Sequence, residues 1–256
     1  MNKYNENGSE SLESTRNISG VSSVIENALT SFKNGLPLAE KNEQLNYTIK
    51  VANSFEERLA VFKLAYSVYL EKGYTKNNIT KLLLNPYDAD QDTLILVVKN
   101  NDKKIIGSVT LVFEGSSKLP AEKIYSDELS LLRHKNEKIA EISRLVIDHQ
   151  YRNAKEILVL LFNYLYIYSF YVKNYSYLVI EVNPRHSNYY EALLNFKAIG
   201  NEKSCSIVEG APAILMALPL KFSQSEVLRL SKTNNLERRN RSLYCYFVRP
   251  EQENLV

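Results

Sequence analysis

The sequence predicts an α/β protein whose central sheet has strands of mixed direction. In the first half of the chain, two β-rich runs on either side of "NNDKK" predict an antiparallel hairpin. In the second half, β-rich runs alternate with helical stretches, a pattern typical of parallel strands. With 256 residues and 45% hydrophobic content, the chain is long enough to bury one full core with extensions at its ends.

Local signals place most of the elements. "YTIKVA" alternates as a strand does, and Ser54 is in position to cap the next helix, which Gly73 ends. A short helix is predicted in "TKNNITKLLL", followed by a turn in "YDADQD" and the hairpin in "TLILVVKNNDKKIIGSVTLVF". The later predicted elements are a helix in "YSDELSLLRHK", a strand in "KIAEISRLVID", a helix from about 155 to 173, a strand in "YLVIEV", a helix in "SNYYEALLNF" and a β-rich run in "CSIVEGAPAILMALPL".

One stretch carries two conflicting periods. In "FNYLYIYSFY" aromatic residues alternate with others at a period of two, which is typical of a strand. The run is too long for an ordinary strand, however, and Tyr164, Tyr168, Tyr171 and Tyr175 also recur at helical spacing. We therefore predict a buried helix here, with its aromatic stripe packed in the core.

Composition divides the chain into three parts. Residues 1–45 are rich in Asn, Ser and Glu and predict a flexible or loosely docked leader. Residues 46–220 contain the elements of the α/β domain. Residues 221–256 are charged and predict a C-terminal extension with one more helix and one more strand.

Charge and cysteine content limit the function classes. A formal charge of +3, without a long Lys and Arg run, is too small to indicate a nucleic-acid partner. The only cysteines, Cys205 and Cys245, supply neither a disulfide framework nor a four-cysteine zinc site. The N-terminus lacks a secretory signal, and "ILVLLFNYLYIYSFYV" is shorter than the roughly 20 residues that cross a bilayer. We expect a cytoplasmic protein with no transmembrane segment.

Three separated stretches, in order, resemble one family. "SVTLVFEGSSKLPAEKIYSDELSLLRHKNEKIAEISRLVID", "VNPRHSNYYEALLNFKAIG" and "VEGAPAILMALPL" resemble the long-chain N-acyl amino acid synthases, which are related to the acyl-homoserine lactone synthases and have a GNAT-like acyltransferase fold. The resemblance covers about residues 46–220. It implies transfer of a fatty acyl group from an acyl-carrier-protein thioester to the α-amine of an amino acid. The donor would be the acyl-phosphopantetheine of the carrier, with no other cofactor bound.

The turn after the strand "EISRLVID" favours a carrier protein over coenzyme A. Coenzyme A-dependent enzymes of this fold usually have glycines there, whose N–H groups close around the pyrophosphate. This chain has "QYRNAKE", in which side chains would crowd the anion and Glu156 would repel it. A carrier presents a single phosphodiester and is acidic, so Arg152 and Lys155 are candidates for docking it. The same two charges also suit an ordinary solvated surface.

Acyl transfer to an amine needs a base, because the α-amine of a free amino acid is protonated at neutral pH. Glu141 is the predicted base, and the resemblance places the Glu-x-x-Arg pair of Glu141 and Arg144 in the active region. On a regular strand, Glu141 and Ser143 share one face while Arg144 lies on the other. A β-bulge would bring all three to one face. A structural ion pair on a half-buried strand is the alternative.

Other candidates would contact the substrates. Tyr190 lies where many GNAT enzymes keep a tyrosine that protonates the leaving thiolate. Arg185, ahead of the neighbouring His186, is a candidate for the acceptor carboxylate or the carrier phosphate. Asp88 and Asp92 are candidates for the acceptor ammonium, and Ser143 for substrate contact. Packing and turn formation are the competing explanations. The D-x-D-x-D spacing that begins at Asp88 lacks the Gly and Glu of a calcium loop, so no metal site is predicted.

Three alternative functions remain open at this stage. The chain could make acyl-homoserine lactones from S-adenosylmethionine, although "LPAEKIYSDELSLLR" and "GAPA" favour the amino acid synthases. A coenzyme A-dependent N-acetyltransferase is opposed by the glycine-free turn. The third alternative is a non-catalytic regulator that binds an acyl carrier or a lipid. Ala65 supports it, because family members often have an arginine at that place in the first helix.

Overall fold

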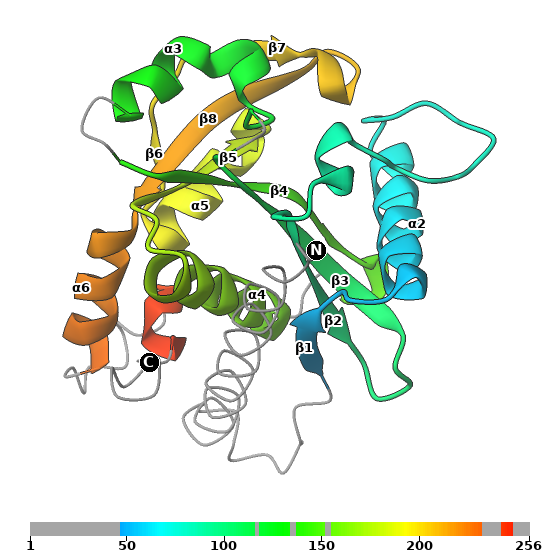
Figure 1. The fold of residues 1–256 in the computed structure, drawn as a ribbon, viewed down its shortest axis with the longest axis horizontal. Coiled ribbons are helices and arrows are strands. Elements are labelled where there is room, and N and C mark those ends of the chain that lie inside the picture. Colours follow the sequence, from blue (N-terminus) through cyan, green and yellow to red (C-terminus); the bar gives the residue numbers. More distant parts are fainter. Residues whose placement is uncertain (1–46, 116–117, 134–136, 152–154, 232–241, 248–256) are drawn as a thin grey trace, which may run out of the picture.

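A mixed β-sheet forms the centre of the molecule (Figure 1). The computed structural model describes residues 47–115, 118–133, 137–151, 155–231 and 242–247. The strand order is β1-β2-β3-β4-β5-β8-β6, with β7 paired to β8, and only β4 and β5 run parallel. The strands are β1 (Thr48–Val51), β2 (Leu94–Lys99), β3 (Ile105–Phe113), β4 (Ile139–Ile147), β5 (Tyr177–Val182), β6 (Lys197–Ala198), β7 (Lys203–Cys205) and β8 (Ala211–Pro219). The predicted α/β class and mixed sheet are confirmed.

Helices cover both faces of this sheet (Figure 1). On one face, α2 (Phe55–Glu71) and α3 (Glu122–Arg133) pack on the sheet. On the other face, the main core contains α4 (Lys155–Ile167), α5 (Ser187–Leu194) and α6 (Leu220–Ser231). The short helical segments are η2 (Pro86–Ala89), η3 (His149–Tyr151), η4 (Tyr168–Val172), η5 (Pro184–His186), η6 (Ser206–Val208) and η7 (Leu243–Tyr246).

Helix α2 begins and ends where the sequence predicts. The Ser54 hydroxyl accepts a hydrogen bond from the backbone N–H of Glu57 at 3.2 Å, and the Glu57 carboxylate accepts one from the Ser54 N–H. Gly73 follows the helix with φ at +70°, a conformation that glycine adopts without strain. The capping contacts fix the N-terminal end of α2, whereas its C-terminal end, with Tyr69 and Lys72, lines the cavity described below.

The helix predicted in "TKNNITKLLL" is wrong, because residues 75–84 form turns and extended chain. Asparagine side chains there hydrogen-bond across the loop. Asn77 Oδ1 accepts from the Tyr66 hydroxyl at 2.7 Å, and Asn78 Nδ2 donates to the Leu82 carbonyl at 3.1 Å. Side chains of this kind compete with the helical backbone bonds that a weak helix would need. Helical backbone reappears only in η2, whose Pro86 starts a 3₁₀ turn.

The aromatic run is helical, as predicted. Helix α4 continues directly into η4, a π-helical segment, and is buried on nearly all sides. The rings of Tyr166 and Phe170 stack at 6.0 Å between centroids, and the Tyr166 and Tyr171 hydroxyls lie 3.2 Å apart. Burial on all sides explains why a helical stripe is hard to see in the sequence.

The C-terminal extension joins the main core. Its predicted helix is α6, but the predicted strand is wrong for the described residues 242–247, which contain the 3₁₀ helix η7. The Ser242 side chain starts that turn by accepting from the Tyr244 N–H at 3.2 Å. The Tyr244 hydroxyl then donates to the Leu194 carbonyl at 2.7 Å, which ties η7 to α5. The leader of residues 1–45 lies outside the described part of the chain.

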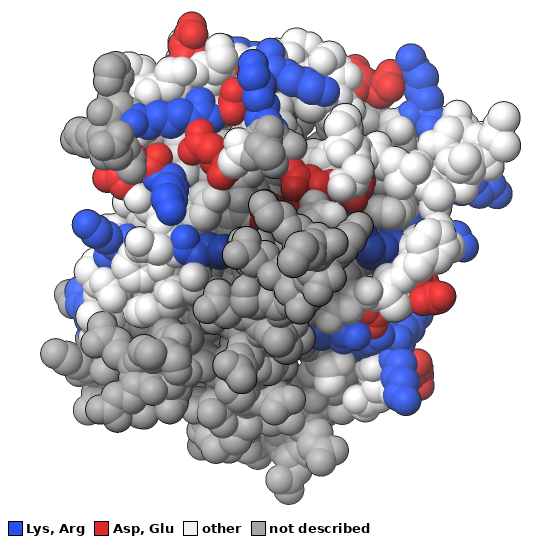
Figure 2. Space-filling model, viewed as in Figure 1, with Lys and Arg blue, Asp and Glu red and all other residues white. Residues whose placement is uncertain are grey.

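Charges of both signs are interspersed on the surface. Figure 2 shows Lys and Arg beside Asp and Glu over α3, at the top of the view. Two pairs contribute there, Lys203 with Glu128 at 2.7 Å and Arg133 with Glu122 at 2.6 Å. None of the described helices is both long enough and apolar enough to cross a membrane.

Candidate active site

The sheet divides where its two parallel strands part. The parallel register of β4 and β5 runs from Ile139 with Tyr177 to Ile142 with Ile180 and stops there. Beyond that point β4 stays paired with β3 to Ile147, and β5 stays paired with β8 to its end. The two strands therefore diverge, and a cavity of about 420 Å³ lies between them.

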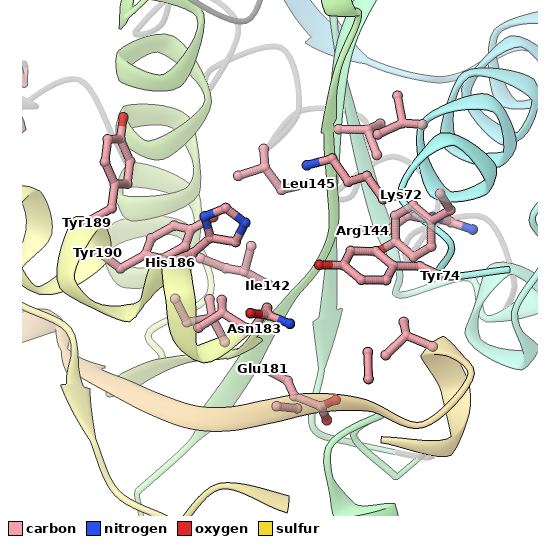
Figure 3. A pocket seen from close by; sticks show the side chains of 18 of the residues that line it. Lys72, Tyr74, Ile142, Arg144, Leu145, Glu181, Asn183, His186, Tyr189 and Tyr190 are labelled. Carbon is pink, nitrogen blue, oxygen red and sulfur yellow. The ribbon is translucent and has the colours of Figure 1, made fainter. Parts of the chain in front are cut away.

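The walls of this cavity differ in chemistry. Figure 3 shows Lys72, Tyr74 and Arg144 on the side of α2, with Glu181 and Asn183 at the floor. The opposite side, formed by α4 and α5, presents mainly apolar and aromatic groups. These include Ile142, Leu158, Phe162, Ile180, Tyr189 and Tyr190, together with His186.

A β-bulge in β4 shapes the α2 side of the cavity. The pairing of β3 with β4 shifts between Ser108 and Thr110, so that two residues of β4, Arg144 and Leu145, lie opposite one residue of β3. Arg144 has φ at +50°, the left-handed region that a non-glycine residue rarely adopts. Its side chain consequently lies on the same sheet face as those of Glu141 and Ser143. The bulge predicted from the sequence is present.

Arg144 is the centre of a buried polar cluster. Its guanidinium pairs with both carboxylate oxygens of Asp88 and donates to the Leu83 carbonyl at 3.1 Å and the Thr110 hydroxyl at 3.0 Å. It also lies 5.4 Å from the ring centroid of Tyr87. Among the described residues its Nε atom is buried without a hydrogen-bond partner. The cluster fixes η2 against β4 and leaves one N–H donor of a cavity-lining side chain unsatisfied.

The structure gives Asp88 and Ser143 protein partners. Asp88 was predicted to bind the acceptor ammonium, but its side chain is buried against Arg144 and also accepts from the Asn85 N–H at 2.7 Å. The Ser143 hydroxyl lies 3.0 Å from the Tyr87 hydroxyl. Both residues therefore support the wall that Arg144 forms, and neither is among the described residues that line the cavity.

Glu141 is enclosed on the same face of the sheet. Its side chain is 2% exposed, and its Oε2 atom accepts from the backbone N–H of Ala121 at 2.8 Å. Burial raises its pKa to about 8, and the nearby Glu181 and Glu122 carboxylates add to that increase, whereas the Ala121 bond opposes it. The contact ties β4 to the start of α3. Glu141 is not among the described residues that line the cavity.

Glu181 is a second carboxylate, and the sequence reasoning missed it. It is half-buried, lines the cavity and is the first β5 residue past the parallel register. Burial raises its pKa, while a hydrogen bond with the Cys205 thiol lowers it. The signal was visible as a single acid in the apolar strand "YLVIEV".

Tyr190 lines the cavity, as its predicted role requires. It projects from α5, where its ring lies 6.1 Å from Phe162 and 6.2 Å from Phe196. Burial raises its pKa to about 12, with a smaller contribution from Tyr189. Its hydroxyl is thus a weak acid that stays protonated at neutral pH.

Arg185 is not among the described residues that line the cavity, but it contacts two residues that are. Its Nη2 donates to the Tyr74 hydroxyl at 2.6 Å, and its Nε donates to His186 at 3.2 Å. Lys76 forms an ion pair with Glu209 at 2.9 Å nearby in the chain. The Arg185–Tyr74 bond joins the loop after α2 to η5, and the Lys76–Glu209 ion pair joins the same loop to the turn before β8. Burial lowers the pKa of His186, and the cations Arg185 and Lys72 lower it further.

Asp92 and Lys155 are not among the described residues that line the cavity. Asp92 is exposed, and its backbone N–H donates to the Asp90 side chain at 3.0 Å, a turn contact. Lys155 begins α4, with its Nζ 4.9 Å from the ring centroid of Tyr246. Arg152 lies outside the described residues, as does the turn at 152–154.

A family model settles the relationship. The model for the N-acyl amino acid synthase FeeM matches residues 60–219. The chain belongs to the FeeM N-acyl amino acid synthase family. It is therefore an acyltransferase, and the resemblance seen in the sequence is confirmed. A comparison with curated protein sequences found no significant match.

Solved structures agree with this membership. FeeM itself, from uncultured soil microbes, superposes with a TM-score of 0.60 at 26% identity over 68% of this chain and 90% of FeeM. The acyl-homoserine lactone synthase LasI gives a TM-score of 0.52 at 17% identity, over 68% of this chain and 89% of LasI. BjaI, a coenzyme A-dependent acyl-homoserine lactone synthase, gives 0.51 at 16% identity, over 68% of this chain and 82% of BjaI. These neighbours confirm the predicted GNAT-like fold.

We predict that Asp88→Asn destabilises the protein strongly. Removing one partner of a buried ion pair leaves the other charge uncompensated, which costs roughly 3–5 kcal/mol of unfolding free energy. Denaturant unfolding followed by circular dichroism measures the loss. The matched control is Asp92→Asn, in an exposed turn of the same segment, for which we expect a change within about 0.5 kcal/mol. Equal effects of the two substitutions would show that the pair with Arg144 adds no stability.

We also predict a pH-dependent effect of Glu141→Gln on stability. The pKa of Glu141 is raised from 4.5 to about 8 on folding, so the folded state binds the extra proton between these values. This group therefore contributes stability below pH 4.5, and that contribution is lost as pH rises toward 8, by at most about 1.4 kcal/mol for each pH unit. A glutamine side chain does not titrate, so the variant lacks this pH-dependent contribution to the unfolding free energy.

The difference in unfolding free energy between Glu141→Gln and wild type should consequently shift in favour of the variant from pH 5 to pH 8. Urea unfolding at several pH values measures it, with Glu191→Gln on exposed helix α5 as the control. A difference that does not change with pH would contradict the raised pKa.

Proposed function

We propose that this family member transfers a long-chain fatty acyl group from an acyl-carrier-protein thioester to the α-amine of an amino acid. The observation that carries the proposal is the two-sided cavity between the diverging strands β4 and β5. An acyl chain needs apolar walls, and an amino acid needs polar ones. A single cavity with both kinds of wall brings the two substrates together.

The apolar side suits the acyl chain. Ile142 and Ile180 come from the two diverging strands, and Leu158 and Phe162 come from α4. All four side chains lie on the sheet face that packs on the main core. A fatty chain placed here gains about 0.8 kcal/mol for each buried CH₂ group, so longer chains bind more tightly for as long as the cavity accommodates them.

Arg144 and Tyr190 take complementary parts in the transfer. Arg144 lines the cavity, and we assign its positive charge to stabilising the negative charge that forms on the thioester carbonyl oxygen as the amine attacks. Tyr190 supplies a proton to the departing thiolate.

Sequence and charge support a carrier protein as the donor. The turn at residues 150–156 has no glycine for wrapping a pyrophosphate. Within this stretch Lys155 begins α4, and Arg152 comes three residues earlier in the sequence. Two cations at this place suit an acidic carrier whose phosphopantetheine enters between β4 and β5. Acyl-CoA is the competing donor.

We predict that the purified full-length protein forms N-acyl amino acids from palmitoyl-acyl carrier protein and an equimolar mixture of the common amino acids. Mass spectrometry detects the amide products. Palmitoyl-CoA at equal concentration should react at least tenfold more slowly. An equal or higher rate with palmitoyl-CoA would overturn the carrier assignment. No amide from either donor would overturn the proposed function and favour a binding protein.

We predict that Tyr190→Phe lowers kcat by about 10²-fold, because the thiolate then leaves without a proton donor. KM for the acyl carrier should change little, since the ring and its packing on Phe162 remain. Steady-state kinetics measure both values. Tyr189→Phe removes the neighbouring hydroxyl, which points away from the labelled polar groups in Figure 3, and should cause a much smaller loss. Equal losses in the two variants would argue against an acid role for Tyr190.

A further inference from the structure

We propose that Glu181 is the carboxylate that binds the ammonium of the acceptor and removes its proton before acyl transfer. This inference rests on the proposed function and deepens it. It assigns the proton acceptor to β5 and gives Glu141, on β4, the separate task of fixing α3 to the sheet.

Access to the cavity distinguishes the two carboxylates. A base must come within hydrogen-bond reach of the proton that it removes, directly or through one water. Glu181 lines the cavity and is half-buried, at the level where β4 and β5 part. Glu141, in contrast, is 2% exposed and is closed off by the Ala121 N–H. An amine inside the cavity can therefore reach the carboxylate of Glu181 but not that of Glu141.

The surroundings of Glu181 favour a cation as its ligand. Its side chain forms no ion pair with a described Lys or Arg, and its hydrogen bond comes from the neutral Cys205 thiol of β7. The neighbouring titratable groups are Tyr125 of α3, Tyr69 of α2 and Glu141 of β4. The cations that line the same cavity, Lys72 and Arg144, lie on the α2 side, and Arg144 is already paired with Asp88.

The position of Glu181 is consistent with an acceptor that binds on the polar side of the cavity. Glu181 lies at the floor, below the polar side formed by Lys72, Tyr74 and Arg144 (Figure 3). The apolar residues of α4 lie on the other side, where we place the acyl chain. An amine held at Glu181 therefore approaches the thioester from the side of α2.

The chemistry balances with these groups. The acceptor ammonium gives one proton to the Glu181 carboxylate, and the neutral nitrogen forms a bond to the thioester carbonyl carbon. The carbon–sulfur bond then breaks. A second proton leaves the nitrogen as the thiolate is protonated through Tyr190, and the proton on Glu181 passes to solvent. The products are the amide, the free thiol of the carrier and one proton.

The test compares pH profiles of kcat/KM for the acceptor, with palmitoyl-acyl carrier protein as donor and the amino acid that reacts best. Wild type should level off once Glu181 is ionised, because the enzyme then deprotonates the bound ammonium itself. In Glu181→Gln only free neutral amine reacts. Its kcat/KM should be about 10²- to 10⁴-fold lower at neutral pH and should keep rising tenfold per pH unit up to the pKa of the free amine. Glu181→Asp should keep the wild-type plateau at a reduced rate.

Two further variants make the result specific. Glu191→Gln, on the exposed side of α5 and paired with Lys197, should leave rate and profile unchanged. Glu141→Gln should keep the levelled profile, whatever its rate, because the proton acceptor is still present. Glu181→Gln should melt no lower than wild type at pH 7, since an amide replaces a carboxyl whose pKa burial raises.

The possible outcomes distinguish a failure of the proposed function from a failure of the Glu181 assignment alone. A wild-type protein that makes no amide overturns the proposed function and this assignment with it. An active wild type together with an unchanged profile in Glu181→Gln overturns the assignment alone. A plateau that is lost in Glu141→Gln and kept in Glu181→Gln would identify Glu141 of β4 as the base.

Discussion

The buried guanidinium of Arg144 is the constraint on which the site depends. A charge removed from water needs compensation, and this one is paired with Asp88 and donates to a backbone carbonyl and a hydroxyl, with only its Nε left without a partner among the described residues. The compensation is possible only because the bulge in β4 turns Arg144 to the face that carries η2. One local distortion of a strand thus holds the segment before β2 in place and forms the polar wall of the cavity.

The short parallel register of β4 and β5 is the second requirement. Each of the two strands keeps an antiparallel partner after they part, so the sheet opens without leaving its strands unsupported. The opening lies between an apolar helix, α4, and the polar end of α2. A substrate with a fatty tail and an acceptor with a charged head can therefore meet inside one sheet without either being placed in the wrong environment.

Two carboxylates on the same face of the sheet have different surroundings. Glu141 is sealed beneath α3 and bonded to a backbone N–H, which suits a fixed structural contact. Glu181 borders open space, and its hydrogen bond is to a thiol. Environment, more than residue type, separates a carboxyl that supports the fold from one that can exchange a proton with a substrate.

The sequence by itself determined the elements that local signals specify: the capped helix α2, the hairpin of β2 and β3, and the helical aromatic run. The family was recognisable from the resemblance of three longer stretches. The sequence also indicated that Glu141 and Arg144 need a bulge to share a face. Only the tertiary structure decided that residues 75–84 form a loop, that Asp88 neutralises Arg144 and that Glu181 faces the cavity. The physical reason is that capping and periodicity act between near neighbours in the chain, whereas burial and charge pairing depend on which distant strands and loops meet.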